Sequence, residues 1–336
     1  MEGPKALRIL LTGAGGPAAI GVARSLKAFH TIGVDSNEYA LNFAETNEAY
    51  RICPASDPDY IPSLNRLVRL LGVDFVHAQP DPEVAVISGR RLSIEAKTFL
   101  PLHQTVIWCQ DKWLAIKRMG DAGVPVPATI PLKGPADLDQ ASWQFGKKFW
   151  VRENVGAAGK GAFLANGYAT ASMWVESINR GWGRFQAAEY LPGRCFTWQS
   201  LWKDGRLVAS QGRERLEWAL ANRSISGVTG VTGVARISND PRLDDIGERA
   251  VRAMETTPNG IFGVDMKENA DGVPCVTEIN IGRFFTTIEF FTQLGLNFPD
   301  LYIRSAMGEE VTGSKLNEGW MWLRSMDAAP KLVRCA

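Results

Sequence analysis

The sequence predicts a protein of the α/β and α+β classes, in which a parallel α/β domain is followed by antiparallel strands and further helices. Three observations lead to this prediction. Apolar strands alternate with helices in the first third of the chain, as in parallel α/β domains. A loop of small residues joins two strands in the middle of the chain. Two alternating strands near residues 265 and 278 are separated by a turn, which predicts a hairpin.

Composition and charge narrow the class of partner. The chain has 336 residues, of which 45% are hydrophobic, so it is long enough for two or three domains with their own cores. Its 37 basic and 36 acidic residues leave a net charge of +1. Because no excess of one sign attracts a nucleic acid or a membrane surface, we expect a small-molecule substrate instead. No apolar run approaches the roughly 20 residues that a membrane span needs.

Cysteines and histidines limit the chemistry. The cysteines show no pair at the spacing of a metal or redox motif, and no signal peptide precedes Leu7, so we expect a cytoplasmic protein with reduced thiols. All histidines lie in the first third of the chain, which argues against zinc catalysis and against a Ser-His triad elsewhere. The remaining chemistry therefore depends on carboxylates, Arg, Lys and metal. The residues concerned are Cys53, Cys109, Cys195, Cys275, Cys335, His30, His77 and His103.

A glycine-rich turn follows the first strand, which we expect at residues 6–11. The spacing Gly13-x-Gly15-x-x-Ala18, with Asp35 at the end of the next strand, matches the dinucleotide-binding fingerprint. The pattern leaves open an NAD(P)-dependent oxidoreductase that uses Gly13, Gly15 and Asp35. A glycine turn into a helix can equally meet another anion, such as a phosphate or a substrate carboxylate.

Two acidic residues follow the strand expected at 73–78. Asp81 and Glu83 lie beyond a strand end, where parallel α/β domains bind ligands, so both are candidates for substrate contact. A solvated loop that caps the following helix is the alternative.

The middle of the chain contains a candidate phosphate-binding loop. Residues 149–163 have the pattern of a strand, a loop and a second strand. Small residues from Gly156 to Gly161 leave backbone amides free to approach phosphates, and Lys160 adds a positive charge. The segment is not a P-loop, because the Gly-Lys-Ser/Thr ending and the following helix are missing. A flexible hairpin without a ligand is the alternative.

The hairpin of residues 264–280 gathers polar side chains. Pairing its strands would bring Asp265, Glu278 and Asn280 together, since Glu278 and Asn280 are two residues apart and share a face. Two carboxylates and an amide oxygen suit Mg²⁺, which prefers oxygen ligands. Arg283 would lie beside that metal, where a guanidinium can neutralise a transferring phosphoryl group or hold a carboxylate. An ordinary exposed hairpin with a polar solvent face is the alternative.

Together these elements resemble the ATP-grasp superfamily, specifically its carbamoyl-phosphate-synthetase-like branch, in which a Rossmann-like domain precedes a two-lobed ATP-grasp fold. The resemblance covers nearly the whole chain. It implies a preceding domain at 1–108, a small lobe with the glycine loop as its flap at 109–187, and a large lobe with the metal site at 188–336. The segments that carry it are Asp111-Lys112 with Gly123-Val124-Pro125-Val126-Pro127, the Val151-Arg152 strand with its glycine loop, Glu189-Tyr190-Leu191-Pro192-Gly193, and Asp265 with Glu278-Ile279-Asn280.

The resemblance also implies residue roles. Two basic positions hold the ATP phosphates, the glycine loop closes over them, and a hinge segment reads the adenine. The nucleotide-binding residues implied in this way are Lys112, Arg152, Gly156, Gly159, Lys160, Gly161, Glu189, Tyr190 and Leu191. The implied metal ligands are Asp265, Glu278 and Asn280, and the candidate catalytic residues are Arg213, Lys267 and Arg283.

Two positions depart from the family pattern. Related sequences commonly carry a Glu that accepts the ribose hydroxyls near the position where this chain has Cys195 or Phe196. The usual Asn-Pro-Arg is replaced by Asn280-Ile281-Gly282-Arg283, which shifts the arginine by one residue.

The activity that the resemblance implies is ATP-dependent ligation. A small-molecule carboxylate would be activated as an acyl phosphate and joined to an amine, with ATP and Mg²⁺ (or Mn²⁺) as cofactors. A nucleotide-binding protein of the same fold without turnover is a further alternative to the oxidoreductase. The sequence identifies neither the carboxylate nor the amine, and it leaves the oligomeric state open, with a homodimer as one option.

Overall fold

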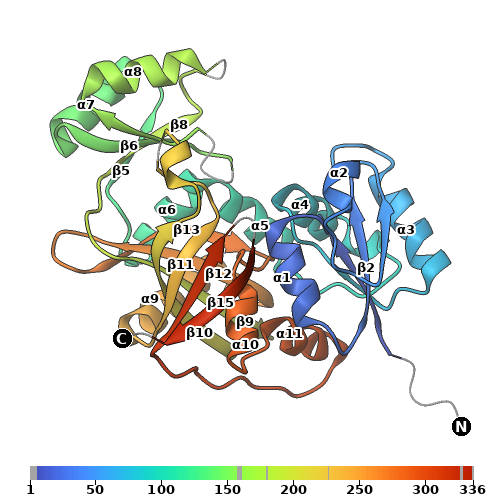
Figure 1. Ribbon diagram of the computed structural model, residues 1–336. Coiled ribbons are helices and arrows are strands. Elements are labelled where there is room, and N and C mark those ends of the chain that lie inside the picture. Colours follow the sequence, from blue (N-terminus) through green and yellow to red (C-terminus); the bar gives the residue numbers. More distant parts are fainter. Residues whose placement is uncertain (1–5, 157–160, 179–180, 226, 326–327, 335–336) are drawn as a thin grey trace, which may run out of the picture.

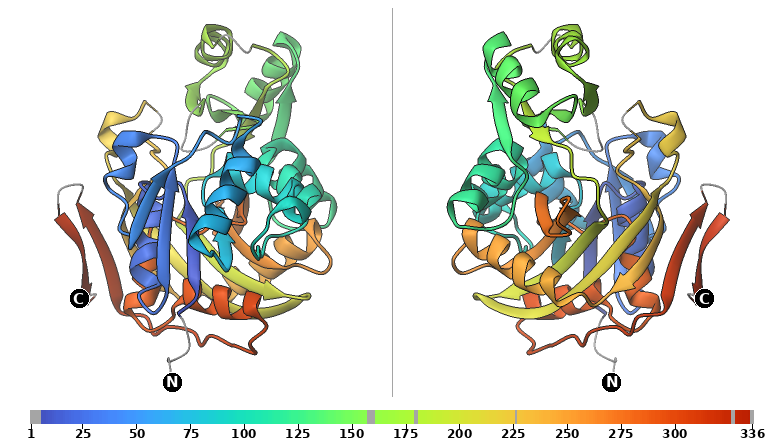
Figure 2. Two further views of the ribbon diagram at one scale, coloured as in Figure 1. Left: turned by 90° about the vertical axis from the view of Figure 1, so that its right-hand side faces the viewer. Right: turned by 90° about the vertical axis from the view of Figure 1, so that its left-hand side faces the viewer.

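The computed structural model describes residues 6–156, 161–178, 181–225, 227–325 and 328–334. Gly159 and Lys160, which are candidate phosphate-binding residues, lie outside this range. The N-terminal domain lies beside a large twisted sheet, and a small lobe extends from one end of the molecule (Figures 1 and 2). In the described part of the chain, no helix is both long and apolar enough to cross a membrane.

The N-terminal domain is a parallel sheet with the strand order β3-β2-β1-β4. This arrangement confirms the parallel α/β domain that the alternation of strands and helices predicts. The strands are β1 (Arg8–Thr12), β2 (His30–Asp35), β3 (Glu48–Arg51) and β4 (Phe75–His77). The helices are α1 (Pro17–Ser25), α2 (Glu38–Leu41), α3 (Tyr60–Leu71), α4 (Asp81–Gly89), η1 (Arg91–Ser93) and α5 (His103–Gln110).

The small lobe is a second, antiparallel sheet with the order β5-β8-β6-β7. Its own apolar core includes Leu132, Phe149 and Phe185, all fully buried, so this lobe packs independently of the other two parts. Helix α6 (Lys112–Asp121) precedes it. The elements of the lobe are β5 (Thr129–Leu132), α7 (Pro135–Phe145), β6 (Lys148–Glu153), β7 (Phe163–Asn166), α8 (Tyr168–Ser177) and β8 (Phe185–Glu189).

The large lobe is built on a seven-stranded sheet with the order β13-β12-β9-β10-β11-β14-β15. Strands β12 and β13 form the predicted hairpin, and Asp265 pairs directly with Glu278. The strands are β9 (Cys195–Lys203), β10 (Arg206–Trp218), β11 (Thr232–Ser238), β12 (Gly260–Glu268), β13 (Pro274–Ile281), β14 (Trp320–Ser325) and β15 (Ala328–Arg334). The helices are η2 (Ala221–Arg223), α9 (Pro241–Met254), α10 (Ile288–Gln293) and α11 (Phe298–Met307).

The N-terminal domain and the large lobe share a continuous core. One buried apolar cluster includes Val76 of β4 together with Trp198 of β9 and Phe262 of β12. Beside it, the Tyr302 ring of α11 meets the Phe75 ring edge-on, and the Tyr302 hydroxyl donates a hydrogen bond to the Phe99 carbonyl oxygen at 2.7 Å. The carboxyl ends of the parallel strands are therefore held in a fixed position against the large sheet.

Candidate functional site

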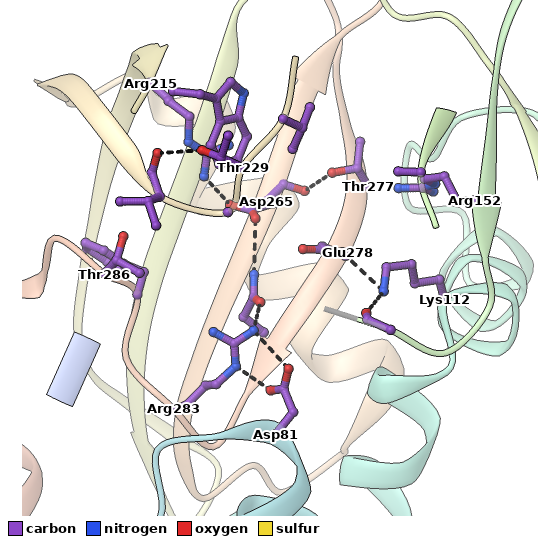
Figure 3. A pocket seen from close by; sticks show the side chains of 18 of the residues that line it. Asp81, Lys112, Arg152, Arg215, Thr229, Asp265, Thr277, Glu278, Arg283 and Thr286 are labelled. Carbon is purple, nitrogen blue, oxygen red and sulfur yellow. Dashed lines mark hydrogen bonds and ion pairs between the residues drawn. The ribbon is translucent and has the colours of Figure 1, made fainter. Parts of the chain in front are cut away.

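A cavity of about 590 Å³ lies where the three parts of the chain meet, and all of them line it. The N-terminal domain contributes the glycine turn and the start of α4, and the small lobe contributes β6 and the residues that flank the glycine loop. The large lobe contributes the β12–β13 hairpin, β10 and the segment that follows Arg283 (Figure 3). The cavity thus joins the elements that the sequence singles out.

The three candidate metal ligands lie together on the hairpin. Asp265 Oδ2 accepts a hydrogen bond from Asn280 Nδ2 at 3.1 Å, and Asp265 Oδ1 accepts one from Thr197 Oγ1 at 2.5 Å. Asp265 and Glu278 are direct partners on neighbouring antiparallel strands, where like charges repel each other. Two adjacent carboxylates at the wall of a cavity suit a hard divalent cation, which would remove that repulsion. The donor set therefore fits Mg²⁺.

Two basic side chains flank the carboxylates from the small-lobe side. Lys112 Nζ lies 3.7 Å from Glu278 Oε2 and also donates a hydrogen bond to the carbonyl oxygen of Gly156. Arg152 has buried Nε and Nη2 atoms that lack a hydrogen-bond partner in the described part of the chain. Burial lowers the pKa of Arg152, while the charge of Glu278 partly offsets this effect. A guanidinium without a partner at the wall of a cavity is suited to an anion such as a phosphate.

The segment predicted to be the hinge, Glu189 to Leu191, borders the same cavity as Lys112 and Arg152. Glu189 and Leu191 line it, and Glu189 Oε1 accepts a hydrogen bond from the backbone N–H of Ala128 at 3.0 Å. The Tyr190 ring instead lies under the ammonium of Lys148, 3.9 Å from it. Of the three predicted hinge residues, two therefore have side chains suited to contact a ligand in this cavity.

Lys267 also lines this part of the cavity. Its Nζ donates a hydrogen bond to the carbonyl oxygen of Gly193 at 3.0 Å, directly after the hinge. This contact places the ammonium beside the segment predicted to be the hinge. Gly156 lines the cavity, and Gly161 adopts a φ of +73°, which favours glycine.

Arg283 is fixed by the N-terminal domain. Its Nε donates a hydrogen bond to Asp81 Oδ1, and its Nη2 donates one to Asp81 Oδ2 at 3.3 Å and another to Asn280 Oδ1. The side chain of Gln79 binds the neighbouring backbone, because its Nε2 donates to the carbonyl oxygen of Phe284 at 2.8 Å and its Oε1 accepts from the Phe284 N–H. The loop after β4 thus orients the arginine toward the candidate metal ligands (Figure 3).

Arg213 and Arg215 are two residues apart on β10, so their side chains lie on the same face of the sheet. Arg215 donates hydrogen bonds to Thr197 Oγ1 at 3.1 Å and to Asp265 Oδ1 at 3.4 Å, and its guanidinium stacks on the Trp218 ring. Arg215 is not among the residues for which the family resemblance implies a role. The spacing Arg213-x-Arg215 is the signal that could have identified it, since residues two apart share a face where the chain is a strand.

Arg213 differs from its neighbour in lacking a counter-charge. The residue is 1% exposed, and its Nε and Nη1 have no hydrogen-bond partner among the described residues. Its guanidinium lies 4.4 Å from the centre of the Phe285 ring, and Nη2 makes one long contact of 3.4 Å to Thr197 Oγ1. Burial, together with the charge of Arg215, lowers the pKa of Arg213 to about 9.

The glycine turn serves packing within the N-terminal domain. A Cβ on Gly15 would lie 1.9 Å from the carbonyl oxygen of Ala40, and a Cβ on Gly13 would lie 2.4 Å from the Pro80 ring. Asp35 Oδ2 accepts a hydrogen bond from the backbone N–H of Gly15 at 3.1 Å, so the Asp35 carboxylate stabilises the turn. The residues of the fingerprint thus have structural partners, which weakens the oxidoreductase interpretation.

The two acidic candidates after β4 have different environments. Asp81 lines the cavity and pairs with Arg283. Glu83 is 6% exposed and has an Oε2 without a hydrogen-bond partner among the described residues. Burial, reinforced by the charge of Asp35, raises the pKa of Glu83 to about 7. The expectation that Glu83 contacts a substrate is therefore wrong, because its side chain points into the protein core.

Solved structures of other proteins share the fold of this chain. Three solved structures with the same fold are the biotin carboxylase domain of 2-oxoglutarate carboxylase from Hydrogenobacter thermophilus, in complex with MgADP and bicarbonate; N5-carboxyaminoimidazole synthetase from Staphylococcus aureus, with ADP; and L-amino acid ligase from Bacillus licheniformis. Their sequence identities to this chain are 16%, 15% and 11%, and their TM-scores are 0.72, 0.71 and 0.70. Each alignment covers 95% of this chain and 74%, 82% and 79%, respectively, of the other.

Sequence comparison assigns the family. No curated protein matches the sequence. The family model of the ATP-grasp domain matches residues 109–287, which is more than half of the chain and contains the glycine loop, the predicted hinge and the hairpin. The chain therefore belongs to the ATP-grasp family.

Proposed function

We propose that the protein is an ATP-dependent ligase that activates a small-molecule carboxylate as an acyl phosphate and joins it to an amine. The observation that carries the proposal is the convergence of three groups on one cavity. Lys112 and Arg152 lie on one side, Asp265 and Glu278 in the middle, and Arg283 beside them (Figure 3). Cations around a pair of carboxylates are what phosphoryl transfer requires, because catalysis depends on positioning and charge neutralisation.

The nucleotide is assigned to the small-lobe end of the cavity. Lys112 and Arg152 would bind the phosphates, and the flap next to Gly156 would cover them. Glu189 and Leu191 would contact the adenine and the ribose end. Closure of the flap would exclude water, which would otherwise hydrolyse an acyl phosphate.

The hairpin would hold the metal. Asp265 and Glu278 would bind Mg²⁺ or Mn²⁺ through carboxylate oxygens, and Asn280 would complete the set or orient Asp265 through its amide. When bound, the ion neutralises phosphate charge during transfer.

The protein's own residues carry the remaining steps. A carboxylate oxygen of the substrate attacks the γ-phosphorus, the bond from the γ-phosphorus to the β–γ bridging oxygen breaks, and ADP leaves. Arg283 would neutralise the negative charge on the transferring group, with its guanidinium oriented by Asp81. An amine then attacks the acyl carbon, the bond from that carbon to the phosphate oxygen breaks, and the nitrogen loses a proton as the amide forms.

Two measurements test the proposal. A thermal-shift comparison should show stabilisation by MgATP and none by NAD(H) or NADP(H), and the reverse result would favour the oxidoreductase. Phosphate release should then appear for some members of a panel of carboxylates and amines. Arg283→Ala should abolish it while MgATP still binds, and Glu278→Ala should lose metal-dependent ADP formation. A protein that binds MgATP and releases no phosphate across the panel would be a nucleotide-binding protein without turnover.

We also propose a homodimer, which light scattering on the purified protein would test.

A further inference from the structure

The cavity has a second end, opposite the proposed nucleotide site. Figure 3 shows Lys112 and Arg152 on one side of the Asp265 and Glu278 carboxylates and Thr286 on the other. The neighbour of Thr286, Phe285, holds the guanidinium of Arg213 against its ring. Arg213 therefore belongs to this second end.

Arg213 lacks an anion at this end. Its side chain is buried, and two of its three guanidinium nitrogens have no hydrogen-bond partner in the described part of the chain. Asp265, which attracts Arg213 electrostatically, is hydrogen-bonded to Arg215 and Asn280 instead. A buried charge without a partner is costly to the folded state, and an anion in the cavity would offset that cost.

The N-terminus of helix α1 faces the same end. Residues from Gly16 to Ala19 line the cavity, and α1 packs against α10 close behind Thr286, where a Cβ on Gly21 would contact Ile288 at 3.6 Å. No side chain of the described residues caps α1, and Pro17 at its first position has no N–H. The N–H groups of Ala18 and Ala19 therefore lack intrahelical partners, and the helix dipole adds positive potential there.

Two independent features thus favour an anion at one place. We propose that this end of the cavity binds a second, non-reacting anionic group of a substrate, a carboxylate or a phosphate, held between Arg213 and the N-terminus of α1. The inference rests on the proposed ligase function, because the group that reacts must lie beside the metal ligands and Arg283. It follows that the substrate at this end carries a carboxylate or a phosphate in addition to its reacting group, as a dicarboxylate or a phosphorylated amine does.

Matched ligands test this with calorimetry on the full chain saturated with MgADP. Succinate is compared with butyrate, and phosphoethanolamine with ethanolamine, so that each pair differs in one anionic group. We expect the second anionic group to tighten binding in at least one pair by about tenfold or more, as a charge-assisted hydrogen bond does. The pair that responds identifies the anion as carboxylate or phosphate. Equal affinities in both pairs would overturn the proposal.

Arg213→Met tests the residue itself. The variant should lose the preference for the anionic ligand and keep the wild-type affinity for MgADP. Its melting temperature without ligand should not fall, since the substitution removes a buried charge that has no partner. Weakened MgADP binding would instead place Arg213 in the nucleotide site and refute the inference.

A second pair of variants tests the helix. Gly16→Asp would place a carboxylate at the N-cap of α1, where it binds the free N–H groups and competes with the substrate anion. Gly16→Ala is the matched control, since a Cβ at this position approaches the Gly13 carbonyl oxygen to 3.2 Å in both variants. Gly16→Asp alone should weaken binding of the anionic ligand, and equal behaviour of the two variants would exclude the helix. If MgADP does not bind the wild-type protein, the ligase proposal fails, whereas titrations without nucleotide still report on the anion site.

Discussion

Glu278→Gln is the most informative change at the proposed metal site. Glu278 faces Asp265 across the hairpin and lies 3.7 Å from Lys112 Nζ. At an effective dielectric constant of about 20, repulsion between carboxylates about 5 Å apart amounts to about 3 kcal/mol, and attraction to an ammonium at the Lys112 distance amounts to about 4.5 kcal/mol. Solvent reduces both terms because the Glu278 side chain is 32% exposed. The two terms oppose each other and differ by about 1.5 kcal/mol before screening, so the metal-free protein should lose at most about that much stability.

The loss should appear only when MgADP is added. At a ligand concentration about 100 times the dissociation constant, binding stabilises the wild-type protein by about 2.7 kcal/mol. If removal of one carboxylate ligand weakens binding about 100-fold, the gain at the same concentration falls to about 0.4 kcal/mol. Thermal melts of both proteins, with EDTA and with MgADP, measure this difference directly.

Glu268→Gln is the matched control, because Glu268 is a carboxylate of the same hairpin, at the end of β12, and lies away from the proposed metal site. Its carboxylate pairs with Arg194 at 2.7 Å and with Arg242 at 3.1 Å. The control should therefore melt at a lower temperature under both conditions and keep the full increment from MgADP. Wild-type stabilisation of Glu278→Gln by MgADP would remove Glu278 from the metal site and contradict the reasoning.

Three further predictions concern other parts of the chain. The pKa of Glu83 is raised from 4.5 to about 7, so the folded protein retains a proton that the unfolded chain releases. Stability should fall as pH rises between these values, by up to about 1.4 kcal/mol per pH unit, and melts of Glu83→Gln should lack this component. Cys195 lines the cavity, so MgADP should slow its alkylation by iodoacetamide but leave that of Cys53 unchanged, as peptide mass spectrometry would detect. Gly15→Ala forces a Cβ against the Ala40 carbonyl oxygen and should destabilise the protein by about 1–3 kcal/mol or more in denaturant titrations.

The hairpin and the family could be predicted because their signals are local. Alternation along two short segments and the turn between them predict the hairpin and bring Asp265 near Glu278. A register shift between Asp265 and Met266 then places Asp265 directly opposite Glu278. The ATP-grasp assignment, made from segments in order along the chain, is confirmed by the family model over residues 109–287. The domain boundaries and the roles of the individual residues remain predictions.

The contacts that orient these residues could not be predicted from local patterns. Asp81 and Arg283 are 202 positions apart, and nothing near either residue encodes their pairing. The burial of Glu83 has the same origin, since a loop after a strand gives no indication of which of two acidic side chains turns inward. Arg215 could have been predicted, because its spacing of two residues from Arg213 is visible in the sequence.

The shifted arginine has a structural explanation in Gly282. This residue adopts a φ of +70°, and a Cβ on it would lie 2.8 Å from Val84 Cγ1 of helix α4. Only glycine permits both the left-handed turn and the close approach of the N-terminal domain. The turn therefore brings Arg283 to Asp81 at the start of the same helix. Gly282 packs against helix α4, and Arg283 pairs with Asp81 at the start of that helix, so the N-terminal domain forms part of the site. The region 109–336 alone would therefore lack the carboxylate that orients Arg283.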